Sequence, residues 1–541
     1  MAKRLYPGNH TKQDEFMLWR NRVPRFIKGE YGVEDIYKTS GLEAFPEYTP
    51  EQLLNEELKT EEALLMGNKK IIDKIQEQRK AGHKIAFISD MHLPVSFLRS
   101  ILIREGAFEE GDGLYVSCDK KARKDTGELY DIVRKDYLPD KWIHYGDNKY
   151  SDHDIARKKG IDAILVDDYF NEPERELVKM SALLPHPYNL SIVAGISRAA
   201  RNKFGSSTEV EVAADFVAAA YIPYIIHVLK DAKQRGIKTL FFVSRDGFIF
   251  RRIAECLPHD DIDLRYLFVS RKSLHSPFFY VAKENELEEL NIKLTSPIES
   301  YQKDYELCCG YFEQEGLFDD NVALVDVGWR GSTRLMINRI RQSKGKTQLM
   351  SYYWGQGIMM LSSNYGEYDV FSYPPNSNEW KTFLLEVYFS ACPWPTTIHY
   401  TQDLGKYHPV FKSGQDYSED IVVKTNTEVC CWLSNIIGDI GIDEGSSFLW
   451  MSIALDILID KGYYVDWSIL KEKYKEKEYS LTVFSHKDTI NYIRGQFYPY
   501  TTNIDVTLDL TYGPQKRVWI KRLRHLYLYL RTIKNKLLNI E

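Results

Sequence analysis

The fold of this chain is constrained most by short apolar segments that end abruptly in polar residues and alternate with helical patterns. Four such segments (KIAFIS, GLYVS, WIHYG and DAILVDD) lie between Lys84 and about Tyr169, and four more (KTLFFVSRDG, LRYLFVSRKS, NVALVDVGWRGST and MSYYWG) lie between about 210 and 400. Buried strands that alternate with helices are typical of parallel sheets built from βαβ units. The sequence therefore predicts an α/β fold with two parallel sheets, whose ligands should bind at the carboxyl edges of the strands.

The same patterns divide the 541 residues into five parts. Residues 1–80 are predicted to be helical, because the leucines of EQLLNEELKTEEALL recur at spacings of three and four. Residues 81–175 form the first α/β domain, 176–209 a proline-containing linker, and 210–400 the second α/β domain. The remainder, 401–541, is mixed and rich in tyrosine.

Composition excludes some classes of protein. A net charge of -6 and a pI near 6.2 argue against a surface built for nucleic acid. The seven cysteines include no Cys-x-x-Cys spacing, which favours a reduced, cytoplasmic protein without a zinc site. The N-terminus has no signal-peptide core, and the longest apolar stretch, Phe216 to Leu229, is too short to span a bilayer.

Polar residues in the first α/β domain form three motifs in a fixed order. A hydroxyl follows the first strand, an ammonium and a hydroxyl lie at a helix start in RKDTGELYDIV, and two acids with an amide follow WIHYG in GDNKYSDHD. These residues are Ser89, Lys124, Thr126, Asp147, Asn148 and Asp152. A hydroxyl and an ammonium can hold phosphate oxygens, and clustered carboxylates can bind a Mg²⁺ ion that offsets phosphate charge.

In this combination and order, the motifs resemble the haloacid dehalogenase (HAD) superfamily. The chain is most similar to the large HAD-like proteins found with glycosyltransferases in surface polysaccharide clusters, whose second motif commonly reads like SDMYLP. Here the segment is SDMHLP, with His92 in place of the tyrosine. The resemblance covers most of residues 15–400, and it implies a HAD-like Rossmannoid parallel sheet with an N-terminal helical cap.

The resemblance also implies roles for individual residues. Ser89 would be the phosphate-binding hydroxyl of the second motif and Lys124 the lysine of the third motif. Asp147 and Asp152 would be the Mg²⁺ ligands of the fourth motif, and Asp90 would orient the turn. In an alternative arrangement, Asp90 is the nucleophile and the hydroxyl comes from Ser117.

The first motif of the family, which resembles DVFDTLL and carries the nucleophilic aspartate, has no counterpart here. Asp14 and Asp35 lie in charged or helical context, and Asp369 has no second acid two residues on. Because in-line phosphoryl transfer needs such a carboxylate, hydrolysis is expected to be lost or very slow. The missing strand would lie between 84–89 and 141–146, so these strands are expected to pair directly, unless another segment fills the gap.

A second family also shares motifs with this chain. SDMHL, GDN and PGNHT imitate the motifs of calcineurin-like metallophosphoesterases. However, Gly8, Asn9 and His10 come first here, whereas the GNH motif comes last in that family. No acid lies three residues after Asp147, where that family has one.

In the second domain, VALVDVGWRGSTRLMINRI predicts a strand that ends at Asp326 and a helix that opens with Ser332 and Thr333. Such a turn can hold phosphate on backbone N–H groups at the helix N-terminus. It looks somewhat like the phosphoribosyl-pyrophosphate loop of phosphoribosyltransferases. Alternatively, Gly328 and Gly331 only permit a tight turn.

Three further polar residues follow predicted strands of the second domain. They are Arg245, Asp246 and Arg271, and they are the best candidates to complete a second phosphate site. Each could equally form a structural ion pair.

The segment from Lys516 to Lys536 is basic, with leucines and tyrosines interleaved. It suits either an amphipathic helix on anionic lipid, at the inner face of the membrane, or a solvated basic helix.

The predicted function is that of a HAD-type phosphohydrolase-like protein that acts on a phosphorylated sugar or lipid-linked saccharide in surface polysaccharide biosynthesis. The alternatives are a non-catalytic sugar-phosphate-binding protein or scaffold for glycosyltransferases, and phosphoribosyltransferase-like chemistry in the second domain.

Overall fold

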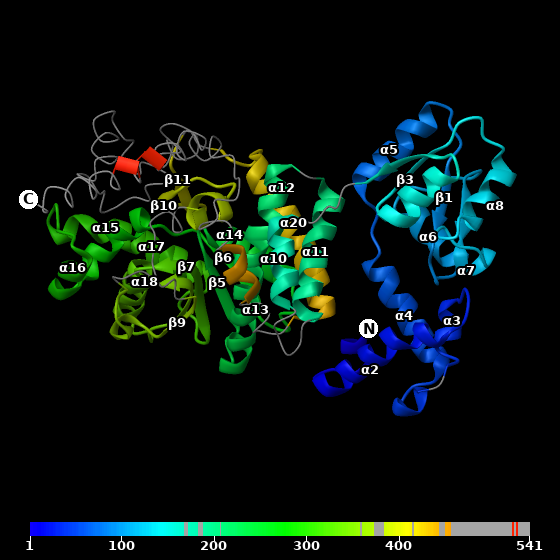
Figure 1. Ribbon diagram of the computed structural model, residues 1–541. Coiled ribbons are helices and arrows are strands. Elements are labelled where there is room, and N and C mark those ends of the chain that lie inside the picture. Colours follow the sequence, from blue (N-terminus) through cyan, green and yellow to red (C-terminus); the bar gives the residue numbers. More distant parts are fainter. Residues whose placement is uncertain are drawn as a thin grey trace, which may run out of the picture. The chain divides into compact units, whose positions relative to one another are not determined.

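The computed structural model describes residues 1–455, apart from 40, 167–170, 182–187, 206, 357–359, 373–383, 414–415 and 443–448, together with 522–523 and 526–527. The chain forms two compact units (Figure 1). The first unit comprises Met1–Ser207 and Asp439–Ser446, and the second comprises Thr208–Gly438 and Ser447–Glu541. Both units contain helices and parallel strands, so the predicted α/β class is confirmed.

The first unit begins with helices over the range for which the sequence predicts them. They are α1 (Ala2–Leu5), α2 (His10–Arg22), α3 (Val33–Ile36), α4 (Pro50–Leu64) and α5 (Lys69–Lys80), with short 3-10 turns η1 (Val23–Phe26) and η2 (Leu42–Ala44). The start of α4 follows from its sequence. Pro50 occupies the first helical position, and Thr49 and Gln52 cap each other's backbone N–H groups.

A buried carboxylate connects these helices to the loop after the first strand. Glu57 of α4 accepts hydrogen bonds from Arg20 at 2.8 and 2.5 Å and from the Tyr37 hydroxyl. His92, in the SDMHLP loop, lies 3.6 Å from Glu57, and its carbonyl accepts a hydrogen bond from the Val33 N–H. His92 therefore anchors the helical region to this loop.

The strands of the first unit form two separate parallel pairs. β1 (Ala86–Ser89) pairs with β2 (Gly113–Val116), and β3 (Ile143–Gly146) pairs with β4 (Asp162–Leu165). The helices between them are α6 (Val95–Arg104), α7 (Ser117–Lys120), α8 (Glu128–Tyr137), the π-helix η3 (Lys149–Ile155) and α9 (Ala156–Lys158). The predicted direct pairing of strands 84–89 and 141–146 is wrong, and no other described strand joins β1 to β3.

The packing around these strands is incomplete in the way that an absent neighbouring strand would leave it. A cavity of about 370 Å³ lies between β1, α6 and α5, and its walls are mostly apolar. No residue of α5 is fully buried, and Ile143 and Ile164 are 41% and 45% exposed. Parallel sheets are normally covered on both faces. The missing connection between β1 and β3 is thus accompanied by loose packing next to β1 and by exposed apolar side chains on the β3–β4 pair.

The predicted linker, 176–209, is largely helical. α10 (Glu172–Ser181) and α11 (Tyr188–Phe204) belong to the first unit. The buried Glu174 of α10 pairs with Arg198 at 2.6 Å and with Arg201 at 2.7 Å, both from α11. Pro173 lies in the first turn of α10, where a helix tolerates proline, so its presence does not indicate a linker.

The second unit is built on a five-stranded parallel sheet with the order β6-β5-β7-β8-β9 (Figure 1). Its strands are β5 (Thr239–Val243), β6 (Asp263–Leu267), β7 (Val322–Trp329), β8 (Met350–Gln356) and β9 (Tyr368–Ser372), of which β9 was not predicted. The helices are α12 (Thr208–Val212), π-helix η4 (Ala213–Val217), α13 (Ala218–Arg235), α14 (Gly247–Glu255), α15 (Arg271–Val281), α16 (Glu284–Leu290), α17 (Gln302–Glu315), α18 (Ser332–Ser343) and α20 (Ile421–Ile440). Shorter turns are η5 (Ile298–Tyr301), η6 (Ser363–Tyr365) and η7 (Leu384–Phe389), and β10 (Thr397–Asp403) and β11 (Lys406–Phe411) form an antiparallel hairpin.

Helices cover both faces of this sheet. One apolar core joins β5, β6 and β7 to side chains of α15, α17 and α18. On the other face, Tyr224 of α13 donates to the Asp326 carbonyl at 3.0 Å, and Trp354 of β8 donates to the Ala220 carbonyl at 2.8 Å. This is the doubly wound arrangement that brings the strand–helix turns to one edge.

The helical stretch Thr208–Arg235 is longer than the apolar run noted in the sequence. It has 28 residues and is the one described helix that is long and apolar enough to cross a membrane by length and composition. Within the protein, 89% of its most apolar window is buried.

The predicted basic C-terminal helix falls mostly outside the described residues. Of that segment, only Arg522, Leu523, Leu526 and Tyr527 are described, and they are helical and exposed. The membrane contact of this segment stays a prediction.

Replacing Glu57 with glutamine tests the buried carboxylate. Burial disfavours ionisation, but the hydrogen bonds from Arg20 outweigh it and lower the pKa of Glu57 from 4.5 to about 2. The ionised form therefore stabilises the fold above about pH 4.5, and this contribution is lost as the pH falls toward about 2. We expect Glu57→Gln to lower the free energy of unfolding at neutral pH by about 3 kcal/mol, measured by urea denaturation.

The matched control is Asp73→Asn, which removes the exposed Lys69–Asp73 pair and should cost less than about 0.5 kcal/mol. Equal losses in the two variants would show that the Glu57 network does not hold the helical region.

Candidate functional sites at the carboxyl edges

The first candidate site lies where β1 ends. The Asp90 carboxylate accepts the backbone N–H of Lys124, at 2.9 Å from Oδ1 and 3.3 Å from Oδ2. Burial raises the pKa of Asp90, although the Lys124 N–H opposes this shift. The next turn is held by Ser117, whose hydroxyl accepts the Met91 N–H at 3.1 Å. Asp90 therefore orients the segment that carries Lys124. The Ser117 hydroxyl is engaged in holding the backbone at Met91.

The side chain of Lys124 joins this edge to the end of β3. Its Nζ lies 2.6 Å from Oδ1 of Asp152, and the two side chains are only 12% and 4% exposed. Thr126 accepts the Glu128 N–H at 3.4 Å, and so caps the first turn of α8 rather than pointing at the ion pair. The structure thus brings the third and fourth motifs together through a largely buried ion pair.

Asp152 is held on all sides by hydrogen-bond donors. His144 Nε2 lies 3.1 Å from Oδ1, and the Asn148 N–H donates to Oδ2 at 3.1 Å. Burial alone would raise the pKa of Asp152, but the contacts with His144 and Lys124 hold it well below its usual range. The Tyr130 hydroxyl lies 3.2 Å from the same His144 nitrogen. Asp152 is therefore an ionised carboxylate at the centre of a preorganised polar cluster.

Gly146 is required for this arrangement. A Cβ at this position would lie 2.4 Å from both Cβ and Cγ of Asp152. Only glycine allows the end of β3 to approach the carboxylate this closely. The close packing against Asp152 thus explains why glycine stands in the GDN motif.

Two predicted site residues lie apart from the cluster. Ser89 lines the apolar cavity beside α5 and α6, and none of its recorded contacts reaches the Lys124–Asp152 pair. Asp147 is exposed. No group of three or more His, Cys, Asp or Glu side chains that could hold a metal is found in the described part of the chain. The expected Mg²⁺ pair, Asp147 with Asp152, stays a prediction.

The second candidate site lies at the topological switch point of the five-stranded sheet. β5 leads through α14 to β6 on one side, whereas its neighbour β7 leads through α18 to β8 on the other. Ligands of doubly wound folds bind in the crevice that such a reversal creates. Asp246 follows β5, whereas Asp326 lies inside β7, so the prediction that this strand ends at Asp326 is wrong, because its pairing with β8 continues to Trp329.

Asp326 has the most perturbed carboxyl group at this edge. Its Oδ1 accepts the Val327 N–H at 2.8 Å. Burial raises the pKa of Asp326 to about 7, because this single short contact and the nearby Arg271 do not offset the lost hydration, and Glu386 adds a like charge. A carboxyl that titrates near neutral pH can hold or release a proton at its site.

Cations and a helix start lie at the same edge. Arg245 follows β5 and Arg271 opens α15, and no hydrogen bond or ion pair of either side chain is recorded among the described residues. Ser332 and Thr333 open α18. Phosphate binding at this edge therefore stays a prediction, which rests on the two arginines and on the helix N-terminus.

The two glycines of this turn have separate explanations. Both have positive φ, 115° at Gly328 and 77° at Gly331. At Gly328 a Cβ would also lie 2.1 Å from the Gly355 carbonyl oxygen of the neighbouring strand. Sheet packing and the tight turn thus account for these glycines without a ligand.

Two residues of the first site were missed in the sequence. His144 lies inside the strand segment WIHYG, and Tyr130 lies on the inner face of α8. Neither residue belongs to a motif. The sequence signal for His144 was that side chains alternate between the two faces of a strand, which turns His144 inward between Ile143 and Tyr145. No protein-family model matches the sequence, and no match was found among curated proteins.

The substitution Gly146→Ala tests the close approach in the first site. The added methyl group should push Asp152 away from Lys124 and destabilise the first unit by about 2–3 kcal/mol. Gly195→Ala in α11 is the control, because a Cβ there meets nothing within 4 Å. Thermal unfolding compares the two, and an unchanged midpoint for Gly146→Ala would contradict the geometry.

The substitution Asp326→Asn tests the titration of the second site. The folded protein holds the Asp326 proton up to about pH 7, whereas an unfolded aspartate with a pKa of 3.8 releases it earlier. The carboxyl therefore favours folding most below about pH 4, and that advantage is lost as the pH rises to about 7. Asparagine has no such proton to lose. We expect the variant to gain about 4 kcal/mol relative to the parent between about pH 4 and pH 8.

The measurement is chemical unfolding of both proteins at the two pH values, followed by tryptophan fluorescence. A difference that does not change with pH would mean that Asp326 is ionised throughout.

Proposed function

We propose that this chain is a HAD-type phosphohydrolase-like protein that acts on a phosphorylated sugar or related phosphate ester. The supporting observation is the Lys124–Asp152 ion pair at the carboxyl edge of β1 and β3, with Asp90 holding the Lys124 backbone. The further role in surface polysaccharide biosynthesis rests on the resemblance of the sequence motifs alone.

Lys124 is the residue on which phosphate recognition depends in this proposal. Its ammonium already lies in a largely buried position at a strand edge, where a phosphate oxygen would add a second anionic partner. Asp152 keeps the lysine extended toward this edge, and His144 keeps Asp152 in place. Ser89 would have to turn from the apolar cavity toward the edge to donate to the same phosphate.

In this proposal, Mg²⁺ binds together with the phosphate ester. Mg²⁺ sites commonly use one or two carboxylates, several waters and the substrate phosphate itself. The exposed Asp147 is the carboxylate that is left for this purpose, because Asp152 is occupied by N–H donors. When bound, the ion would offset phosphate charge.

A second candidate is phosphate-ester binding without turnover, either as a sugar-phosphate-binding pseudoenzyme or as a scaffold for glycosyltransferases. It is favoured by the gap between β1 and β3, since the family's nucleophilic aspartate would belong to the strand that fills it. No such carboxylate is found among the described residues. Asp90 is then the remaining acid that could act as the nucleophile. Its oxygens, however, accept the Lys124 N–H.

For the second unit we propose that the switch-point crevice binds a phosphorylated ligand through Arg245, Arg271 and the start of α18. Phosphoribosyltransferase-like chemistry, cytoplasmic location and peripheral membrane contact stay predictions from the sequence.

The deciding experiment measures binding and hydrolysis separately. Calorimetry with glucose 1-phosphate should detect binding to the parent chain, and Lys124→Ala should weaken it at least tenfold, by roughly the loss of one charge-assisted contact. Lys135→Ala, on the exposed side of α8, is the matched control. Absence of binding to the parent chain would overturn both candidates.

Release of phosphate from a panel of sugar phosphates, with and without Mg²⁺, then separates the two candidates. We expect release to be very slow or absent. Release that disappears in both Asp90→Asn and Asp147→Asn would establish hydrolysis with Asp90 as the nucleophile, whereas binding without release would establish the second candidate.

A further inference from the structure

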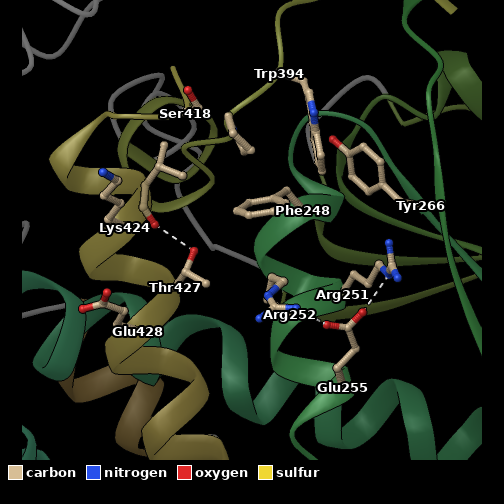
Figure 2. A pocket seen from close by; sticks show the side chains of 12 residues that line it. Phe248, Arg251, Arg252, Glu255, Tyr266, Trp394, Ser418, Lys424, Thr427 and Glu428 are labelled. Atoms are coloured by element: carbon tan, nitrogen blue, oxygen red, sulfur yellow. Dashed lines mark hydrogen bonds and ion pairs between the residues drawn. The ribbon is translucent and has the colours of Figure 1, made fainter. Parts of the chain in front are cut away.

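A cavity of about 440 Å³ lies in the second unit between α14 and α20, and no part of the proposed phosphate chemistry uses it (Figure 2). Thr427 of α20 faces Phe248 and Arg252 of α14 across the space, and Lys424 lines it farther along α20. Its volume is within the range of small-molecule sites, roughly 300–1,000 Å³. The cavity is therefore large enough for one or two sugar rings.

One end of this cavity is aromatic. The Trp394 ring lies 5.4 Å from the ring of Phe248 and 5.0 Å from that of Tyr266, at interplanar angles of 89° and 39°. Tyr266 is buried, whereas Trp394 and Phe248 are half-buried and line the space. Mutual ring contacts hold the indole in one orientation. Such a wall can pack against the C–H face of a sugar ring.

The other end is ionic. Arg251 and Arg252 both pair with Glu255, at 2.9 and 2.6 Å, so one carboxylate is shared between two guanidinium groups. Lys424 of α20 already pairs with Glu419, and Glu428 adds a second acid to the lining. The two guanidinium groups that share Glu255 thus leave N–H donors that an anionic group can use.

We propose that this cavity binds an anionic saccharide, meaning a sugar that bears a carboxylate or a phosphate. The ring packs against Trp394 and Phe248, and the anionic group lies beside Arg251 and Arg252. Glu428 accepts a hydrogen bond from a sugar hydroxyl. A carboxylate on the wall needs O–H or N–H donors from the ligand, and the hydroxyl groups of a sugar supply them.

This inference does not depend on the phosphate site of the first unit. The aromatic and ionic walls all belong to the second unit, and none of their residues is used by Lys124 or Asp152. Glucuronate is therefore the best first probe, because its charge is a carboxylate rather than a phosphate.

The test is ligand-observed saturation-transfer NMR on the full chain with glucuronate, glucose and UMP, followed by titration. We expect glucuronate to bind more tightly than glucose and to bind equally well to Lys124→Ala. Arg252→Ala should weaken glucuronate binding about tenfold and leave glucose binding unchanged, since it removes one charge-assisted contact. Trp394→Phe should weaken the binding of both sugars.

Lys406→Ala, an exposed cation on β11, is the matched control and should bind glucuronate like the parent chain. Binding of UMP without either sugar, or glucuronate binding that survives both Arg252→Ala and Trp394→Phe in folded protein, would overturn the proposal. No sugar binding to the folded parent chain would overturn it as well.

Discussion

The geometry of parallel strands is the constraint on which both units of this protein depend. Two neighbouring parallel strands need a crossover between them, so the strands of a parallel sheet point the same way and their strand–helix turns emerge at one edge. Polar residues that follow different strands are thereby brought together even when they are far apart in the sequence. Asp90 and Asp152 meet Lys124 for this reason, and Arg245 comes to the same edge as Asp326.

The charged side chains at the two sheet edges differ in how they are paired. In the first unit the central ammonium and carboxylate neutralise each other, and His144 and backbone N–H groups complete the coordination of the acid. At the edge of the second sheet, no carboxylate partner of Arg245 or Arg271 is recorded among the described residues, while the burial of Asp326 pushes its carboxyl toward the neutral form. The first edge is a preorganised cluster of paired charges, whereas the second edge carries two arginines beside the acids Asp246 and Asp326.

Several features were predictable because they follow from local pattern. The eight strand segments, the α/β class and a change of unit close to 210 all follow from apolar runs that end in polar residues. The helices in 176–209 were not predicted, because prolines and charged residues occur both in linkers and in the first turn of a helix. Only the ion pairs of Glu174 with α11 distinguish the two cases. The strand β9 was also missed, since its segment contains no long apolar run.

The sequence by itself determined which residue types stand at the strand ends, because a strand's length and its terminating polar residues are local properties. It thereby placed Lys124 and Asp152 among the site candidates. Only the tertiary structure decided which partners these residues take, that Ser89 faces the apolar cavity, that β1 and β3 do not pair, and that Trp394 and Arg252 line one cavity. Those outcomes depend on contacts between segments distant in the chain, and no local pattern carries them.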